Sequence, residues 1–80
     1  PPSEHMIVLR NDDRPGVIGE VGTILGENGI NIADMNVGRS KDGLGALMVI
    51  STQNPVPQAI GEKLINTDGV TECSIVNLPD

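Results

Sequence analysis

A short polar loop carries the side chains best suited to bind a small charged molecule. Residues 11–16 lie directly before a predicted helix, whose unpaired N–H groups and dipole favour an anionic group at that point. Within the loop, the carboxylate of Asp13 can bind an ammonium, and the amide of Asn11 can both donate and accept hydrogen bonds. Pro15 and Gly16 complete the helix start. The loop therefore offers groups that complement an α-amino acid.

Each of these residue types also has a structural interpretation. Asp is enriched as a helix cap and Asn in turns, so Asp13 could cap the helix and Asn11 could shape the loop. Asn31, expected one residue into the second strand, could similarly mark a helix exit or a strand start. The structural roles are the more common ones, so binding has to be argued from the wider pattern.

The composition excludes several classes of function. With 11 acidic against 5 basic residues and no Phe, Tyr or Trp, the chain lacks the positive charge and the stacking rings that nucleic-acid binding needs. Its longest apolar run, residues 46–50, is too short to cross a membrane. A chain of 80 residues also has a thin core, which argues against a self-sufficient enzyme with a deep cleft. We expect a small soluble domain that binds neither nucleic acid nor membrane.

Few side chains could support catalysis or hold a metal. Cys73 and His5 are the single residues of their types, so neither an internal disulfide nor a Cys and His zinc site is expected. Cys73 lies in an apolar run and is interpreted as a small buried hydrophobe. The adjacent carboxylates Asp12 and Asp13 lack the separated environments of a general acid and base. We expect no catalytic residue, no cofactor, no metal and a reducing, cytoplasmic setting.

The hydrophobic pattern predicts six elements that position the loop. Apolar positions at helical spacing predict a first helix that begins at Pro15, a residue type favoured at the first helical position, and ends at Asn28. A narrower apolar stripe predicts a second helix between Pro57 and Asn66. An Asp-Gly turn signal in residues 38–43 predicts a hairpin. Apolar and β-branched runs predict strands over residues 6–9, 30–37, 46–51 and 70–78.

The order strand, helix, strand, strand, helix, strand predicts an α+β fold of the ferredoxin-like βαββαβ type. Its architecture is a four-stranded antiparallel sheet with two helices on one face. Right-handed crossovers place the first strand beside the third, which leaves the second and fourth strands as edges. An exposed edge favours pairing with another chain.

Three glycines in the first helix need a physical reason. Gly19, Gly22 and Gly26 recur at spacings of three and four, and each costs about 1 kcal/mol relative to alanine. A row of glycines on one helix face allows another backbone to approach closely. Two explanations stay open, packing within the domain and packing across a dimer seam.

Residues 13–19, the helix that follows and residues 29–33 resemble the ACT domain, a small regulatory amino-acid-binding module. Residues 38–39, 46–50 and 68–70 agree with the same family. The resemblance covers residues 6–78, which leaves residues 1–5 as a linker or an expression remnant and residues 79–80 as a tail. Within the family, the chain is most similar to the C-terminal regulatory domains of D-3-phosphoglycerate dehydrogenases and nearly as similar to those of iron–sulfur L-serine dehydratases.

The resemblance implies a non-catalytic regulatory domain whose parent chain is an enzyme. In the dehydrogenase family L-serine, the end product of the pathway, binds between two ACT domains paired edge to edge. By motif position, Asn11 and Asp13 of one copy would face Asn31 of the other, beside Pro15 and Gly16. Some family members carry His or Tyr where this chain has Asn11.

This resemblance predicts a homodimer through the edge strand and the first helix, with L-serine or another small amino acid as the ligand for allosteric feedback control. Two alternatives remain: the regulatory domain of an L-serine dehydratase, or a structural dimerisation module that binds no ligand.

Overall fold

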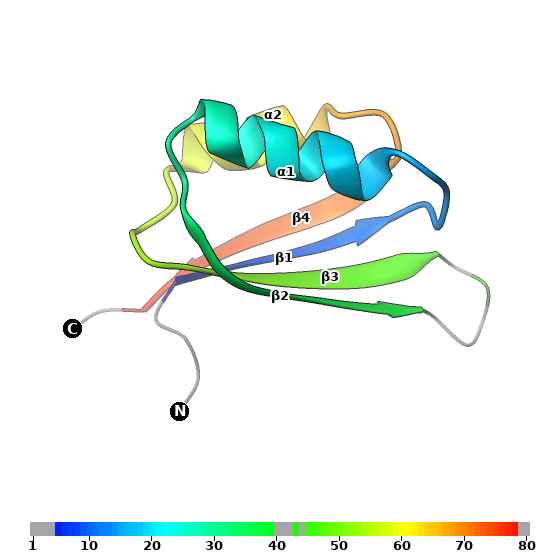
Figure 1. The fold of residues 1–80 in the computed structure, drawn as a ribbon, viewed down its shortest axis with the longest axis horizontal. Coiled ribbons are helices and arrows are strands. Elements are labelled where there is room, and N and C mark those ends of the chain that lie inside the picture. The colour runs from blue at the N-terminus through cyan, green and yellow to red at the C-terminus, as the bar shows by residue number, and fades with distance from the viewer. Residues whose placement is uncertain (1–4, 40–42, 44, 79–80) are drawn as a thin grey trace.

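Six regular elements follow one another in the computed structural model, which describes residues 5–39, 43 and 45–78 (Figure 1). They are strand β1 (His5–Asn11), helix α1 (Val17–Glu27), strands β2 (Ile32–Arg39) and β3 (Ala46–Thr52), helix α2 (Gln58–Ile65) and strand β4 (Val70–Asn77). The predicted order of elements is confirmed. Most of the expected linker, part of the Asp-Gly turn and the C-terminal tail lie outside the described residues.

The sheet has the strand order β2-β3-β1-β4, and each neighbouring pair is antiparallel. Both helices cover one face of this sheet (Figure 1). β2 and β4 are therefore the edges, as the crossover argument predicts. Figure 1 also shows α1 over the β2 side of the sheet and α2 over the β4 side.

The core lies between the sheet and the two helices. In β1 and β3 every second side chain points toward the helices, which is the two-residue period of a half-covered sheet. In α1 the buried positions recur every four residues, whereas Ile18, an apolar residue of the same helix, is 44% exposed. The fully buried side chains of this core are Ile7, Leu9, Val21, Leu25, Met48, Ile50, Val56 and Leu64.

The start of α1 differs from the prediction. Gly16 has a φ of 94° and is the N-cap residue, so α1 begins at Val17 and Pro15 lies in the preceding turn. A left-handed residue cannot continue a right-handed helix, which is why the favoured position of proline misplaces the start. At the N-terminus of α1, no side chain of the described residues forms a capping hydrogen bond. Asp13 is therefore not the cap that the structural interpretation offered.

Candidate functional site

One row of side chains crosses the sheet at the end of β1. Asn11 pairs with Ala46 of β3, and Ala46 pairs with Arg39 of β2. Directly opposed residues of neighbouring strands project from the same face of a sheet. Asn11 and Ala46 each lie two residues from a buried core side chain of the same strand, so this row lies on the helix-covered face. A small side chain thus separates an amide from a guanidinium.

Asn11 is the last residue of β1 and not a loop residue as predicted, and it is only 3% exposed. Its Nδ2 donates a hydrogen bond of 3.0 Å to the carbonyl oxygen of Asp12. Its Oδ1 is buried and accepts no hydrogen bond from any described residue. A buried acceptor without a partner costs about 1–3 kcal/mol. A bound molecule with a donor group would remove this cost.

Asp13 forms an ion pair with Arg39 at the end of edge strand β2. The Nε of Arg39 lies 3.1 Å from Oδ2 of Asp13, and the two side chains are 82% and 48% exposed. The anionic group expected to receive an ammonium is therefore already close to a cation of the same chain. Sequence reasoning used Arg39 only as part of the family resemblance, because its place beside the loop follows from the β2–β3 register.

The neighbouring end of β3 approaches the β1 backbone closely. Gly45 has a φ of 94°, and a Cβ built on it would collide with the backbone oxygen of Asn11. Only glycine fits both the left-handed backbone and the missing space. Gly45 therefore holds the last residue of β1 against the start of β3.

Arg14 ties the other side of the loop to the turn between α2 and β4. Its Nη2 lies 3.1 Å from Oδ2 of Asp68, and its Nε lies 3.4 Å from Oδ2 of Asp12. These carboxylates raise the pKa of the Arg14 guanidinium, first through the hydrogen bond and attraction of Asp68. The backbone N–H of Asp12 also donates a 2.7 Å hydrogen bond to the carbonyl oxygen of Gly69. The predicted site residues Pro15 and Gly16 line a small hollow beside Arg14 on this side.

Asn31 lies away from the other predicted residues. It precedes β2, which begins at Ile32 and not earlier as predicted, and its Nδ2 donates a 3.0 Å hydrogen bond to Oε1 of Gln53. Arg39 is at the far end of β2, about 25 Å away for an eight-residue strand. One chain therefore brings Asn11 and Asp13 to the same end of the sheet but leaves Asn31 at the other end.

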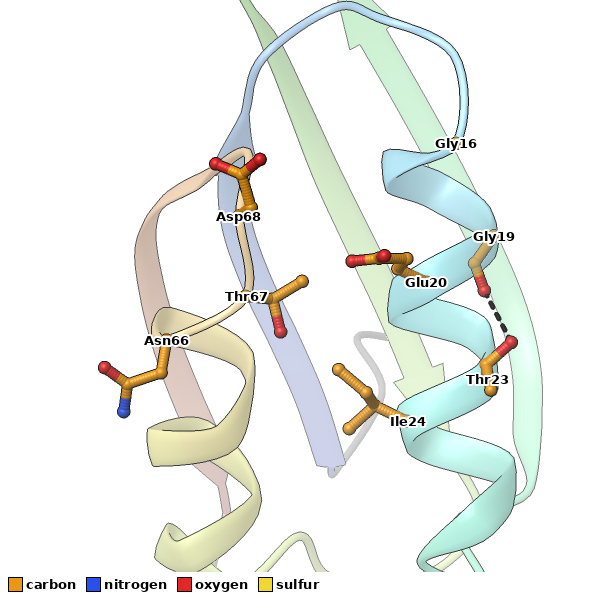
Figure 2. Close-up of a pocket in the computed structure, with 8 residues that line it drawn as sticks. All are labelled: Gly16, Gly19, Glu20, Thr23, Ile24, Asn66, Thr67 and Asp68. Atoms are coloured by element: carbon orange, nitrogen blue, oxygen red, sulfur yellow. Dashed lines mark hydrogen bonds between the residues drawn. The ribbon is translucent and has the colours of Figure 1, made fainter.

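A larger groove lies between α1 and the α2–β4 turn (Figure 2). Figure 2 shows Glu20 and Ile24 directed into it, while Asn66 points away. Its volume is about 700 Å³, and it is lined by Gly16, Gly19, Glu20, Thr23, Ile24, Asn66, Thr67 and Asp68.

Both hydroxyl groups of this groove are hydrogen-bonded to helix backbone, and Asp68 is paired with Arg14. The hydroxyls of Thr23 and Thr67 donate to the backbone oxygens of Gly19 and Lys63, both at 2.9 Å. The groove therefore offers few unengaged polar groups to a small ligand. We therefore place the candidate site at the Asn11 row and the loop.

Residues 5–69 match the family model described as the ACT domain. This chain belongs to the ACT domain family. It is 38% identical over 78 residues to D-3-phosphoglycerate dehydrogenase of Bacillus subtilis, and the match covers 98% of this chain and 15% of that protein. It is 42% identical over 79 residues to D-3-phosphoglycerate dehydrogenase of Archaeoglobus fulgidus, which covers 96% of this chain and 15% of that protein. The ACT domain thus spans about 15% of the length of these curated relatives.

A solved structure shares the fold. The regulatory subunit of aspartate kinase from Thermus flavus superposes with a TM-score of 0.73 at 22% identity, over 95% of this chain and 53% of that one. The expected ferredoxin-like architecture of the ACT domain is confirmed.

The glycines of α1 have open space beside them in this ACT domain. A Cβ built on Gly19, Gly22 or Gly26 meets no atom within 4 Å. Close packing inside the domain, one of the two predicted reasons for these glycines, is therefore wrong for the part of the chain that the structure describes. The approach of a second chain stays a prediction.

Two further features of the described residues bear on alternative functions. Within residues 5–39, 43 and 45–78, no three His, Cys, Asp or Glu side chains gather where they could hold a metal ion. None of the helices in those ranges has the length and apolar character needed to cross a membrane.

Proposed function

We propose that this ACT domain is a regulatory module that forms a homodimer through β2 and α1 and binds L-serine at the seam between the two copies. The observation that carries the proposal is the buried, unpartnered Oδ1 of Asn11, which lies one residue from the loop that holds Asp13. A ligand donor at Oδ1 and a ligand ammonium at Asp13 would both be satisfied by one small amino acid.

The edge strand and the first helix lie on the same side of the domain (Figure 1). β2 is an edge strand whose outer backbone groups are available for pairing with another strand. Apolar side chains are exposed on both elements, with Val37 of β2 and Ile18 of α1 each 44% accessible. The glycines of α1 leave room for a second helix. Each of these features supports a seam at this side.

Two-fold pairing would also bring Asn31, which lies far from Asn11 and Asp13 within one chain, to the site from the second copy. When two copies of β2 pair antiparallel about a two-fold axis, the start of each strand lies near the end of the other. Asn31 precedes β2, and Arg39 ends it beside Asp13. Such pairing would bring Asn31 of the partner subunit toward the loop, giving two equivalent sites per dimer.

The surroundings favour a small side chain on the ligand. Ala46 and Gly45 flank Asn11, and Gly16 precedes α1. Asn11 is only 3% exposed, so the row leaves little room for an aromatic side chain. A serine hydroxyl, in contrast, could donate to Oδ1 of Asn11 or bind the amide of Asn31 of the partner subunit.

Binding at a seam gives a physical route to regulation. A ligand that contacts both copies stabilises the paired state by its differential affinity. In a parent enzyme similar to the D-3-phosphoglycerate dehydrogenases, L-serine would then change the relative placement of catalytic portions, with a coupling free energy of about 1–3 kcal/mol.

Titration calorimetry tests the proposal, with L-serine, glycine and L-phenylalanine as ligands. We expect saturable binding of L-serine at one site per chain and its loss in Asn31→Ala. Asn66→Ala is the matched control, because Asn66 is an exposed amide that donates to the backbone oxygen of Glu62 in its own helix. No binding by a folded dimer would favour a structural dimerisation module instead.

A further inference from the structure

We propose that Arg39 binds the α-carboxylate of the ligand. In the absence of the amino acid, Arg39 and Asp13 pair with each other, and the ligand replaces this ion pair when it binds. This inference rests on the proposed function and assigns a role to a residue outside the predicted set. The ligand class that it specifies is a zwitterion with both a free ammonium and a free carboxylate.

The sheet places Arg39 at the right position for this role. Arg39, Ala46 and Asn11 form one cross-strand row, so Arg39 and Asn11 are two strand spacings apart, or about 9–10 Å. Between them lies the small, buried side chain of Ala46. Asp13 reaches into this region from the loop, since its Oδ2 lies 3.1 Å from Nε of Arg39.

A zwitterionic amino acid complements both members of the pair. Its ammonium can replace the guanidinium at Asp13, and its carboxylate can replace Asp13 at Arg39. One ion pair is then exchanged for two, and the planar guanidinium can hold a carboxylate through two parallel hydrogen bonds. Oδ1 of Asn11 is buried without a donor among the described residues, so a ligand that reaches it could give it a third hydrogen bond.

The exposure of the pair makes this exchange easy. With Arg39 82% and Asp13 48% exposed, water screens their attraction, so little is lost when the pair opens. Arg14 is less suited to the role because Asp12 and Asp68 both contact it. Arg39 contacts a single carboxylate among the described residues, and that carboxylate belongs to the proposed site.

Calorimetry with three probes separates the two charged ends of the ligand. The probes are L-serine, L-serinamide, which lacks the carboxylate, and 3-hydroxypropionate, which lacks the ammonium. The variants are Arg39→Gln and Arg39→Lys. The matched control is Arg10→Gln, which removes an exposed arginine that pairs with Glu72. Circular dichroism verifies that each variant is folded.

We expect Arg39→Gln to bind L-serine about tenfold to hundredfold more weakly than the unmodified chain. It should no longer distinguish L-serine from L-serinamide, while Arg39→Lys retains part of this discrimination and Arg10→Gln all of it. Unchanged affinity and discrimination in Arg39→Gln would overturn the role of Arg39 and leave the proposed function standing, as would an equal loss in Arg10→Gln. Failure of the unmodified chain to bind any probe would overturn both.

Discussion

The Nε of Arg39 lies 3.1 Å from Oδ2 of Asp13, so the end of the edge strand β2 is joined to the loop that begins α1. These are the two parts of the chain that the proposed dimer seam would share. A ligand that exchanges with this ion pair would therefore act on the strand edge and the helix start together. Ligand binding and pairing of the two copies would be coupled through the same residues.

Asn11→Leu should separate stability from binding. The replacement has a similar size and removes both a buried oxygen that has no partner and the hydrogen bond from Nδ2 to Asp12. These two effects oppose each other, so we expect the free energy of unfolding to change by no more than about 1 kcal/mol. L-serine binding should be lost. Chemical denaturation and calorimetry measure the two effects. A loss of more than about 2 kcal/mol would show that the amide of Asn11 is structural.

Gly45→Ala should destabilise the fold strongly. The new Cβ would collide with the Asn11 backbone at a φ of 94°, and we expect a loss of more than about 2 kcal/mol in the free energy of unfolding. Gly43→Ala is the matched control, because Gly43 also has a positive φ of 77° but no atom within 4 Å of a new Cβ. Its cost should be about 1–2 kcal/mol from the left-handed backbone alone. Equal losses in denaturant titrations would contradict the close approach of β3 to β1.

Gly22→Ala should stabilise the single chain and weaken self-association. A methyl group at this position meets nothing in its own domain, so the higher helix propensity of alanine should add about 0.5–1 kcal/mol. The same methyl group would obstruct a second helix at the seam. Thermal unfolding of dilute protein measures the first effect, and sedimentation equilibrium measures the second. Self-association as strong as that of the unmodified chain would remove Gly22 from the seam.

Cys73 should react slowly with thiol reagents. Burial raises the pKa of its half-buried thiol, which lowers the thiolate fraction at a given pH. We expect alkylation at pH 8 to be slower in the folded chain than in the chain unfolded in urea. Because the raised pKa belongs to the folded state, its contribution to stability is present at neutral pH and is lost as the pH rises through that pKa. Equal alkylation rates in both states would contradict the burial of Cys73.

The sequence predicts the architecture better than it predicts the site. Apolar runs in β1 and β3 and the spacing of Val17, Val21 and Leu25 in α1 each supply a continuous buried face, so the order of elements and the two sheet edges follow from them. Local signals fail where the backbone is unusual. The left-handed Gly16 moves the helix start past Pro15, because a preference for proline at a helix start carries no information on the φ of the next residue.

The site depends on contacts between distant parts of the chain. Asn11 is predicted in a loop because Asn, Asp and Arg cluster after the apolar run, but pairing with Ala46 and Val70 extends β1 through it. Arg39 reaches Asp13 only through the register of β2 on β3, which no local pattern reports. Asn31 lies at the opposite end of β2, so its predicted role depends on a second copy of the chain.

Subunit complementation tests most directly whether two copies share one ligand site. Asp13→Ala and Asn31→Ala each remove one of the side chains proposed to contact the ligand, so neither variant alone should bind L-serine in calorimetry. After mixing under conditions that exchange subunits, each mixed dimer should regain one intact site, formed by Asp13 of one copy and Asn31 of the other. Random exchange of equal amounts makes about half of the dimers mixed, and each of these has one of its two sites intact. We therefore predict recovered binding at about a quarter of the number of sites in the unmodified protein. Two folded, exchanging variants that stay inactive when mixed would contradict a site shared across the seam.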